Sequence, residues 1–271
     1  MPRRVLHARW LLPFVIVLAA VALCRNTGAP RWRVVRPGVE FATIAGEPYC
    51  RFGSSTVALL RVDPRQARFR VHHYQGAHPP RPLTILEWLH GTRAVAVFNA
   101  GQFYPDYTYM GMLVSEGDTI SARLHPGFQA ALVARDTAAR VIDLSRGSIE
   151  RRDRWSDVAQ SFMLFDRASG LRVRRSDKIA NRTVVGQDAQ GRLVVCVSEG
   201  AYTLADFAEL LGRAPLSLDR AMSMDGGSES QLVVSAPGFR YASFGHWPVR
   251  GEPAAASAAT ALPAVIALEV P

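Results

Sequence analysis

Short apolar runs alternate along the chain with polar breaks that contain glycine or proline, a pattern typical of many short strands. The clearest run is residues 94–98, where Ala, Val and Phe follow one another without a polar residue, as in a strand buried on both faces. β-Branched and aromatic residues dominate the other predicted strands. These are residues 39–44, 55–62, 68–73, 110–114, 130–133, 161–165, 183–186, 193–197, 221–224, 231–235 and 262–270.

Only two segments carry a helical pattern. Residues 203–211 place leucines and a phenylalanine on one face, with Thr203 as an N-cap and Gly212 as the end of the helix. Residues 83–89 predict a second, shorter helix. Because strands outnumber helices and do not alternate with them regularly, the sequence predicts an α+β domain with a mixed β-sheet core and a few short helices.

The first 24 residues have the composition of an export signal. Arginines at positions 3, 4 and 9 precede an uncharged stretch of 15 residues, 10–24, which is short for a membrane span of about 20 residues but suits a signal peptide. Small residues at Ala20 and Ala22 favour cleavage after Ala22. The alternative is a retained signal-anchor that holds the protein at the inner membrane through residues 10–24. Both interpretations predict export to the periplasm or cell envelope.

Length and composition predict one folded domain behind this segment. The chain has 271 residues, of which 48% are hydrophobic, which excludes intrinsic disorder. We expect a signal or anchor at residues 1–24, a polar linker at 25–36 and a single domain at 37–271. Within that domain, residues 251–261 form an Ala/Pro/Ser-rich link before the last strand.

Charge and cysteine content exclude several classes of function. The net charge is +9, but Lys178 is the only lysine among 32 basic residues, and the arginines form no basic run, so nucleic acid is not an expected partner. Cys50 and Cys196 remain after signal cleavage, and the sequence leaves a disulfide between them open. Neither cysteine nor any histidine has metal-ligand spacing, so we expect no metal and no cofactor.

Three segments share the form of an apolar strand that runs into a polar residue and glycines. They are residues 96–104 (AVFNAGQFY), 181–193 (NRTVVGQDAQGRL) and 221–230 (AMSMDGGSES). A strand end of this kind can aim a polar side chain, while glycine lets backbone N–H groups approach a ligand. Several such ends that converge would build a binding site.

The order of these segments resembles the phosphodiester glycosidase family. That family carries an N-G-G-[FY]-F strand end, a G-[LM]-hydrophobic strand, an R-T-x-x-G strand, a D-G turn, a helix, a strand ending in D-G-G-[GS]-S and a terminal strand. The resemblance covers residues 37–270. The matching segments are residues 99–103 (NAGQF), 111–114 (GMLV), 182–186 (RTVVG), 199–200 (EG), 203–211, 225–228 (DGGS) and 262–267 (LPAVIA).

The resemblance implies a hydrolase that cleaves a sugar-1-phosphate phosphodiester, such as an N-acetylglucosamine phosphodiester, at the anomeric carbon. It implies Asp225 as the catalytic carboxylate, Arg182 as the partner of the leaving phosphate and Glu199 as a further catalytic candidate. Substrate contacts are implied for Asn99, Gly101, Thr183, Gly226, Gly227 and Ser228.

Each of these residues also has a structural interpretation. Asp-Gly-Gly is common in hairpin turns, Arg182 could be an exposed strand residue, Asn99 could cap a turn, and Glu199 could lie in a surface turn. The chain also departs from the family pattern, with Ala100 and Gln102 in place of glycine and an aromatic residue, Ser223 where asparagine is common, and Glu229 after the DGGS turn. The alternative function is therefore a non-catalytic glycan-binding or polysaccharide assembly protein on the same fold.

The signal interpretation predicts that a fusion of residues 1–30 to a reporter crosses a bacterial inner membrane, because a charged segment followed by 15 uncharged residues directs export. Reporter activity measured in periplasmic and cytoplasmic fractions tests this. A reporter that stays in the cytoplasm would contradict the envelope location.

Overall fold

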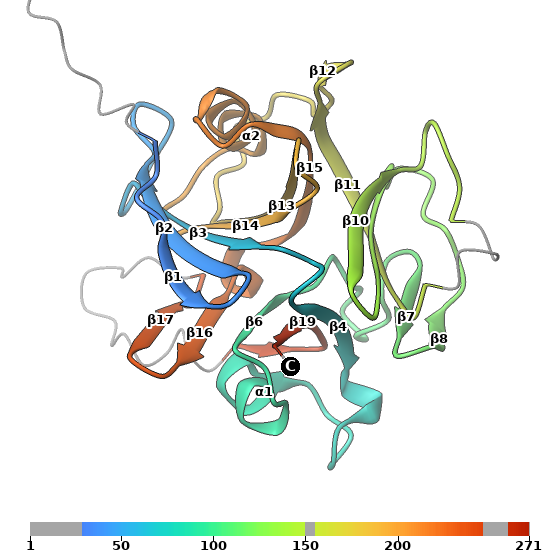
Figure 1. Cartoon of the computed structure of the whole chain (residues 1–271). Helices are drawn as coiled ribbons and strands as arrows, with labels where there is room; N and C mark the ends of the chain where they lie inside the picture. The colour runs from blue at the N-terminus through green and yellow to red at the C-terminus, as the bar shows by residue number, and fades with distance from the viewer. Residues whose placement is uncertain (1–28, 150–154, 246–259, 271) are drawn as a thin grey trace, which may run out of the picture.

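Two β-sheets packed face to face make up most of the computed structural model, which describes residues 29–149, 155–245 and 260–270 (Figure 1). All pairings between the described strands are antiparallel. The large sheet has twelve strands. Its main path, in spatial order, is β1 (Arg33–Arg36), β2 (Val39–Ala45), β3 (Thr56–Val62), β14 (Leu193–Ser198), β13 (Arg182–Asp188), β15 (Leu218–Gly226), β11 (Asp157–Asp166), β7 (Leu113–Ser115) and β8 (Asp118–Ser121).

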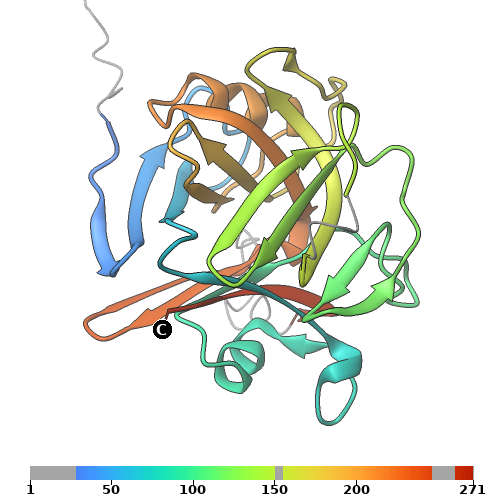
Figure 2. The ribbon, with the colours of Figure 1, turned by 45° about the vertical axis from the view of Figure 1, so that its right-hand side comes forward.

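Three further strands branch from the large sheet at β11. They are β9 (Ala130–Arg135), which pairs with β11, β10 (Ala138–Asp143), which pairs with β9, and β12 (Gly170–Leu171). β9 and β10, together with β7 and β8, form a lobe at one side of the molecule (Figure 2), whereas β12 pairs with the other end of β11.

The small sheet has five strands, and a two-stranded ladder lies apart from it. In spatial order the five are β17 (Phe239–Ser243), β16 (Leu232–Ala236), β6 (Ala96–Asn99), β19 (Ala264–Glu269) and β4 (Arg68–His73). The ladder pairs β5 (Leu83–Thr84) with β18 (Ala261–Leu262).

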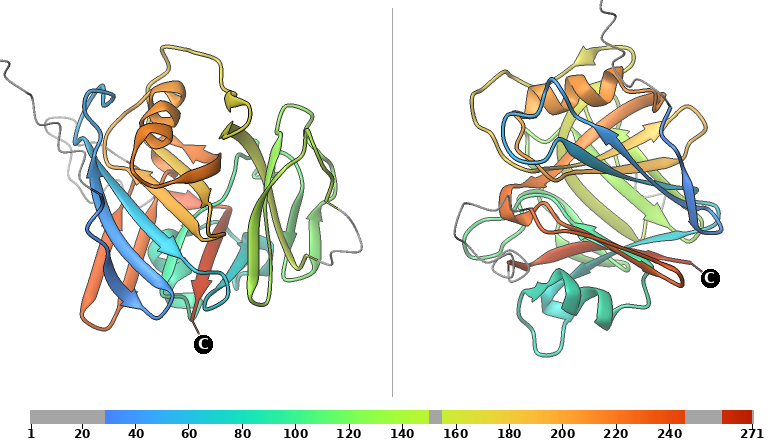
Figure 3. Two further views of the ribbon diagram at one scale, coloured as in Figure 1. Left: turned by 45° about the horizontal axis from the view of Figure 1, so that its top comes forward. Right: turned by 90° about the vertical axis from the view of Figure 1, so that its left-hand side faces the viewer.

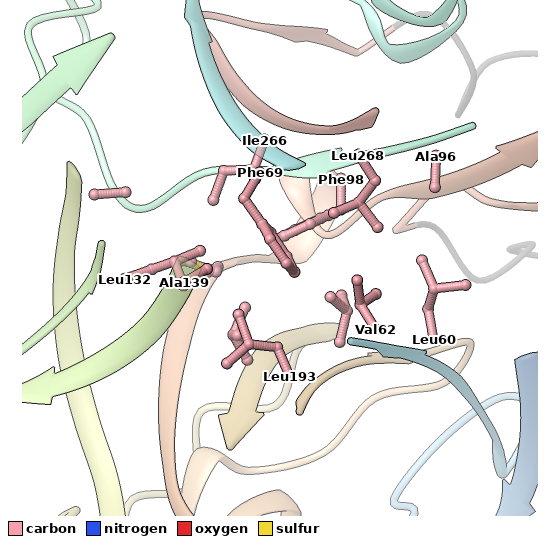
Figure 4. Packing of buried hydrophobic residues seen from close by; sticks show 14 of the residues in the cluster. Leu60, Val62, Phe69, Ala96, Phe98, Leu132, Ala139, Leu193, Ile266 and Leu268 are labelled. Carbon is pink, nitrogen blue, oxygen red and sulfur yellow. The ribbon is translucent and has the colours of Figure 1, made fainter. Parts of the chain in front are cut away.

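The main hydrophobic core lies between the two sheets. Phe98, Ile266 and Leu268 of the small sheet face Leu60 and Leu193 of the large sheet, and all five are fully buried (Figure 4). Burial of this apolar surface is the main force that holds the sheets together.

One helix covers the outer face of each sheet, which gives four layers (Figure 3). Helix α2 (Leu204–Arg213) packs Phe207 against the large sheet. Helix α1 (Ile85–Gly91) packs Trp88 against the small sheet, and the indole Nε1 donates a 2.9 Å hydrogen bond to the carbonyl oxygen of Leu262.

The structure confirms a β-sheet core with a few short helices, although strands dominate more than the α+β class implies. Residues 33–36, expected in a polar linker, form β1 and pair with β2. Helix α2 continues through Gly212 and ends at Arg213. Pro215 ends it, because the residue before a proline does not readily adopt the helical conformation. Helix α1 begins at Ile85 because Thr84 is its N-cap in a capping box with Glu87.

Two expectations concern residues that the structure does not describe. The signal or anchor at residues 1–24 and most of the link at residues 251–261 lie outside the described ranges. Within those ranges, no helix combines the length and apolarity needed to cross a lipid bilayer. Both Cys50 and Cys196 are free thiols, which answers the question of a disulfide that the sequence left open.

Candidate active site

The connection between β15 and β16 carries the chain from the large sheet to the small one, and the candidate carboxylate, Asp225, lies just before it, at the end of β15. β15 ends at Gly226, a 3₁₀ turn spans Gly227–Glu229, and β16 begins at Leu232. The backbone N–H of Asp225 donates to the carbonyl oxygen of Ala100 at 3.1 Å, immediately after the end of β6. The two sheets are therefore joined at Asp225.

Asn99, the last residue of β6, reinforces this junction with its side-chain amide. Its Nδ2 donates to the carbonyl oxygens of Asp225, at 3.0 Å, and Ala100, at 3.1 Å. Its Oδ1 accepts from the Thr183 hydroxyl at 2.8 Å and from the backbone N–H of Gln231 at 3.2 Å. Asn99 is 1% exposed, so both ends of the amide face protein groups, and they hold the Asp225 peptide in place.

Thr183 belongs to the same buried network. Besides its bond to Asn99, its hydroxyl lies 2.8 Å from the hydroxyl of Ser230, and both residues are completely buried. The structure thus brings Thr183 to the junction, but its hydroxyl points into the protein interior.

Arg182 lies beside the junction on the neighbouring strand, where it pairs with Gly226. Its Nε donates to the carbonyl oxygen of Tyr202 at 3.0 Å, and its Nη2 donates to that of Lys178 at 2.8 Å. Among the described residues, Nη1 has no hydrogen-bond partner. These two bonds fix the plane of the guanidinium and leave one nitrogen on the side of Gly226.

Asp225 combines burial with a mixed set of charges. Burial raises the pKa of its carboxyl to about 6, and the charge of Glu229 raises it further. The hydrogen bond from the Gly226 N–H to Oδ1, at 2.8 Å, and the charges of Lys178 and Arg182 lower that pKa and only partly offset the burial. A carboxyl with this pKa changes protonation near neutral pH, as a catalytic acid or base requires.

The glycines around Asp225 are required for packing. A side chain at Gly226 would place its Cβ 2.8 Å from the carbonyl oxygen of Asn181, and Gly227 has a φ of +78°. Their N–H groups bond within the protein, that of Gly226 to Asp225 and that of Gly227 to the Asn181 carbonyl at 3.0 Å. The backbone donors that the resemblance implies for a ligand therefore already have partners.

Tyr109 is a neighbour of the site that none of the sequence motifs includes. Its buried hydroxyl accepts from the Gly101 N–H at 3.1 Å and donates to the carbonyl oxygen of Gln160 at 2.9 Å. A side chain on Gly101 would collide with this hydroxyl. Burial raises the pKa of Tyr109, and the charge of Asp225 raises it further, so the phenol stays neutral. No motif in the sequence marks it.

Gln102, a departure from the family pattern, links β15 to β11 beside the junction through two hydrogen bonds. Its Nε2 donates to the carbonyl oxygen of Met224 at 3.0 Å, and its Oε1 accepts from the Ser161 hydroxyl at 2.9 Å. A phenylalanine at this position could make neither bond. Gln102 therefore fixes the residue that precedes Asp225.

Glu199 and Ser228 occupy different surroundings. The Glu199 carboxylate accepts from the Ser54 hydroxyl at 3.0 Å and from the Tyr241 hydroxyl at 2.8 Å. Glu199 is not among the charged groups that shift the pKa of Asp225. Ser228 is exposed, and its hydroxyl donates to Glu229 Oε2 at 2.9 Å. The carboxylate whose charge raises the pKa of Asp225 is that of Glu229, a residue that the sequence marked only as a departure.

The comparison with protein families agrees with this arrangement. The profile of the family described as phosphodiester glycosidase matches residues 92–268, which contain the whole junction. The chain belongs to the phosphodiester glycosidase family. No curated protein matches the chain significantly.

Solved structures share the fold of this family member. A zebrafish N-acetylglucosamine-1-phosphodiester alpha-N-acetylglucosaminidase catalytic domain, auto-inhibited by its pro-peptide, matches with a TM-score of 0.61 and 14% identity, over 90% of this chain and 87% of that one. A hypothetical protein from Synechocystis matches with a TM-score of 0.62 and 13% identity over 90% of this chain, which spans only 64% of that protein. A putative exported protein from Burkholderia pseudomallei matches with a TM-score of 0.52 and 13% identity, over 81% of this chain and 74% of that one.

Within residues 29–149, 155–245 and 260–270, no group of three or more His, Cys, Asp or Glu side chains is arranged to hold an ion. The polar groups that converge at the junction are a carboxylate, a guanidinium and buried amides and hydroxyls.

The raised pKa of Asp225 predicts how Asp225→Asn changes stability with pH. The folded-state pKa, about 6, exceeds the usual value of 3.8, so ionisation costs the native state about 2–3 kcal/mol once the pH passes 6, and nothing below pH 3.8. We expect the Tm of Asp225→Asn to equal or exceed the parent's at pH 7.5, and the gain to disappear at pH 4.

Thermal melts of both proteins at the two pH values measure this effect. The control is Asp219→Asn, which removes a surface carboxylate paired with Arg167 and should shift Tm little. A Tm loss in Asp225→Asn that is larger at pH 7.5 than at pH 4 would mean that Asp225 is only a structural turn residue.

Proposed function

We propose that this chain is an exported hydrolase that cleaves a sugar-1-phosphate phosphodiester, of the N-acetylglucosamine phosphodiester type, at the anomeric carbon. Family membership supports the reaction class, and the shared fold with the zebrafish catalytic domain supports the domain type. The observation that carries the proposal is the Asp225 carboxyl, held at the sheet junction with a pKa of about 6 and flanked by the charges of Arg182 and Lys178.

The chemistry follows from the charges at the junction. The bond between the anomeric carbon and the phosphate oxygen breaks, and its electron pair leaves with the phosphate as a phosphomonoester. A water oxygen bonds to the anomeric carbon, and ionised Asp225 accepts the water proton and later releases it to solvent. The negative charge of Asp225 also stabilises positive charge that develops on the sugar ring. A phosphate is a good leaving group and departs without a proton donor. A nearby cation that neutralises its negative charge therefore helps it more than a general acid would.

Arg182 and Lys178 are the cations that we assign to the phosphate. Arg182 is held rigidly by two backbone carbonyls, and the exposed Lys178 lies close enough for its charge to act on Asp225. The N-terminal pattern of the sequence supports a place for this reaction in the periplasm or cell envelope, with residues 10–24 as the alternative membrane anchor.

Arg182→Lys should lose at least about tenfold in kcat/KM, nearly as much as Arg182→Ala. Lysine keeps the charge, but it cannot reach two carbonyls and a phosphate with one planar group. Hydrolysis of sugar-1-phosphodiesters by residues 25–271 measures the loss. Arg192→Lys is the matched control, because Arg192 pairs with Asp188 at the far end of the β13–β14 hairpin. A full-rate Arg182→Ala variant would end the assignment.

Asp225→Asn should lose at least about a hundredfold in turnover while the protein stays folded, since removal of one electrostatic stabiliser costs about 10²–10³ in rate. In the parent, turnover should rise with pH through about 6, and at pH 5 it should be about a tenth of its plateau. Initial rates from pH 4.5 to 9 measure both effects.

Two results would contradict this assignment. Near-parental turnover in well-folded Asp225→Asn would withdraw Asp225 and leave Glu199 as the next candidate. Sugar affinity without any turnover in the parent would favour the alternative, a glycan-binding protein on the same fold.

A further inference from the structure

A short hairpin rich in aromatic residues follows β6 closely along the chain. We call residues 103–109 (FYPDYTY) the aromatic hairpin. The Tyr104 N–H donates to the carbonyl oxygen of Thr108 at 2.8 Å, and the Tyr107 N–H donates to that of Tyr104 at 2.8 Å. The first and last residues pair as an isolated β-bridge. These backbone contacts fix the shape of the hairpin.

The aromatic hairpin begins close to Asp225. Ala100, whose carbonyl oxygen accepts from the Asp225 N–H at 3.1 Å, lies three residues before it, so at most about 10 Å of extended chain separates that bond from the hairpin. The Met110 N–H donates to the carbonyl oxygen of Gln102 at 2.9 Å, and Gln102 Nε2 donates to that of Met224 at 3.0 Å. The base of the hairpin is therefore held beside the strand end that carries Asp225.

The aromatic hairpin and Arg182 lie on opposite sides of β15. Arg182 belongs to β13, which pairs with one edge of β15. Gln102, at the base of the hairpin, bonds instead to the Ser161 hydroxyl of β11, the strand that pairs with the other edge. A substrate that places its phosphate at Arg182 and its anomeric carbon at Asp225 therefore extends its sugar toward the hairpin.

Two tyrosines of the aromatic hairpin are half exposed, Tyr104 at 44% and Tyr107 at 42%. Tyr107 has a φ of +67°, which disfavours a bulky side chain, and strain of this kind at an exposed position indicates a functional constraint. Its ring lies 6.1 Å from that of Tyr74 and 6.2 Å from that of Phe103, between centroids. Neither contact is a parallel stack, since the planes meet at 67° and 54°. The ring is thus held in place with apolar surface left for a ligand.

The charge of the aromatic hairpin suits a sugar better than a phosphate. Its sequence contains no arginine or lysine, although the chain has 32 basic residues. Its one charged residue is Asp106, whose Oδ1 accepts from the Thr108 N–H at 2.9 Å. This carboxylate repels a phosphate but can accept hydrogen bonds from sugar hydroxyls. A tyrosine ring offers an apolar face to the C–H groups of a sugar ring and a hydroxyl to its polar edge.

We propose that the aromatic hairpin is a binding surface for the sugar of the substrate, on the side of Asp225 opposite to the phosphate, with Tyr107 and Tyr104 as its contact residues. The inference rests on the proposed function and adds the sugar contact to it. The rings stack on the apolar face of the sugar. They contribute to its affinity and take no part in bond cleavage.

Tyr107→Asn tests the proposal, because asparagine tolerates a positive φ and removes the ring. We expect its Kd for N-acetylglucosamine to rise about fivefold, the order that loss of one aromatic contact produces. Its Kd for inorganic phosphate should stay at the parent's value. With a sugar-1-phosphodiester as substrate, KM should rise by the same factor while kcat changes little. Ligand-observed NMR titrations measure both Kd values, and thermal melts show that the variant is folded.

Three further variants separate stacking from other effects. Tyr107→Phe keeps the ring without its hydroxyl and should bind N-acetylglucosamine within about twofold of the parent. Leu171→Ala removes an exposed apolar side chain on β12, at the other end of β11, and should leave this affinity unchanged. Arg182→Ala should show the reverse of Tyr107→Asn, with weaker phosphate binding and the sugar affinity of the parent.

An unchanged Kd for N-acetylglucosamine in folded Tyr107→Asn would overturn the proposal. An equal loss in Tyr107→Phe would also overturn it, because the contact would then belong to the hydroxyl and not to the ring. The titrations need no turnover. A chain that binds N-acetylglucosamine through Tyr107 but hydrolyses no phosphodiester would therefore uphold the sugar surface and refute the proposed function.

Discussion

The candidate site depends on one buried amide. Asn99 ends a strand of the small sheet, and its side chain bonds to the Asp225 and Ala100 carbonyls, to Thr183 of the large sheet and to the backbone of Gln231. Each of these buried groups would cost about 1–3 kcal/mol if it lost its partner, so the network allows essentially one arrangement of the two sheet ends. That arrangement determines where the Asp225 carboxylate lies.

The electrostatics of Asp225 follow from the same junction. Packing of the two sheets removes water from the carboxyl and favours its neutral form, whereas the hydrogen bond from the Gly226 N–H and the charges of Lys178 and Arg182 favour the charged form. Burial raises the pKa more than these groups lower it, and the resulting value of about 6 lets the carboxyl gain and lose a proton near neutral pH. A fully exposed Asp would lack the first effect, and one in a closed ion pair with Arg182 would be held in its charged form.

The sequence predicts the strands of the structure well, but it predicts the contacts between different segments poorly. The apolar run ending at Asn99 and the strand before Asp225 were both evident, because alternation and β-branched residues are local signals. The role of Tyr109 was not, because its hydroxyl meets the Gly101 N–H only once the loop between them has folded. Helix α2 continues past Gly212 because glycine permits a helix end but does not require one, and Pro215 ends the helix instead.

The site residues show the same division between local and non-local signals. The motif order marked Asn99, Arg182, Thr183 and Asp225, and the structure brings them together at the junction. It could not tell which of them face the protein interior, because that depends on partners far away along the chain. Glu199 illustrates this limit: the Tyr241 hydroxyl that bonds to its carboxylate comes from β17, on the other sheet.

The departures from the family pattern are not scattered, and their positions explain why the fold tolerates them. Ala100 contributes its carbonyl oxygen to the Asp225 N–H, a bond that any residue can make. Gln102 replaces aromatic packing with two directed hydrogen bonds, one of which holds Met224. Glu229 places a carboxylate where the family pattern has a serine, and it accepts a hydrogen bond from the Ser228 hydroxyl. The scaffold that places Asp225 is therefore kept, while the field around its carboxylate differs.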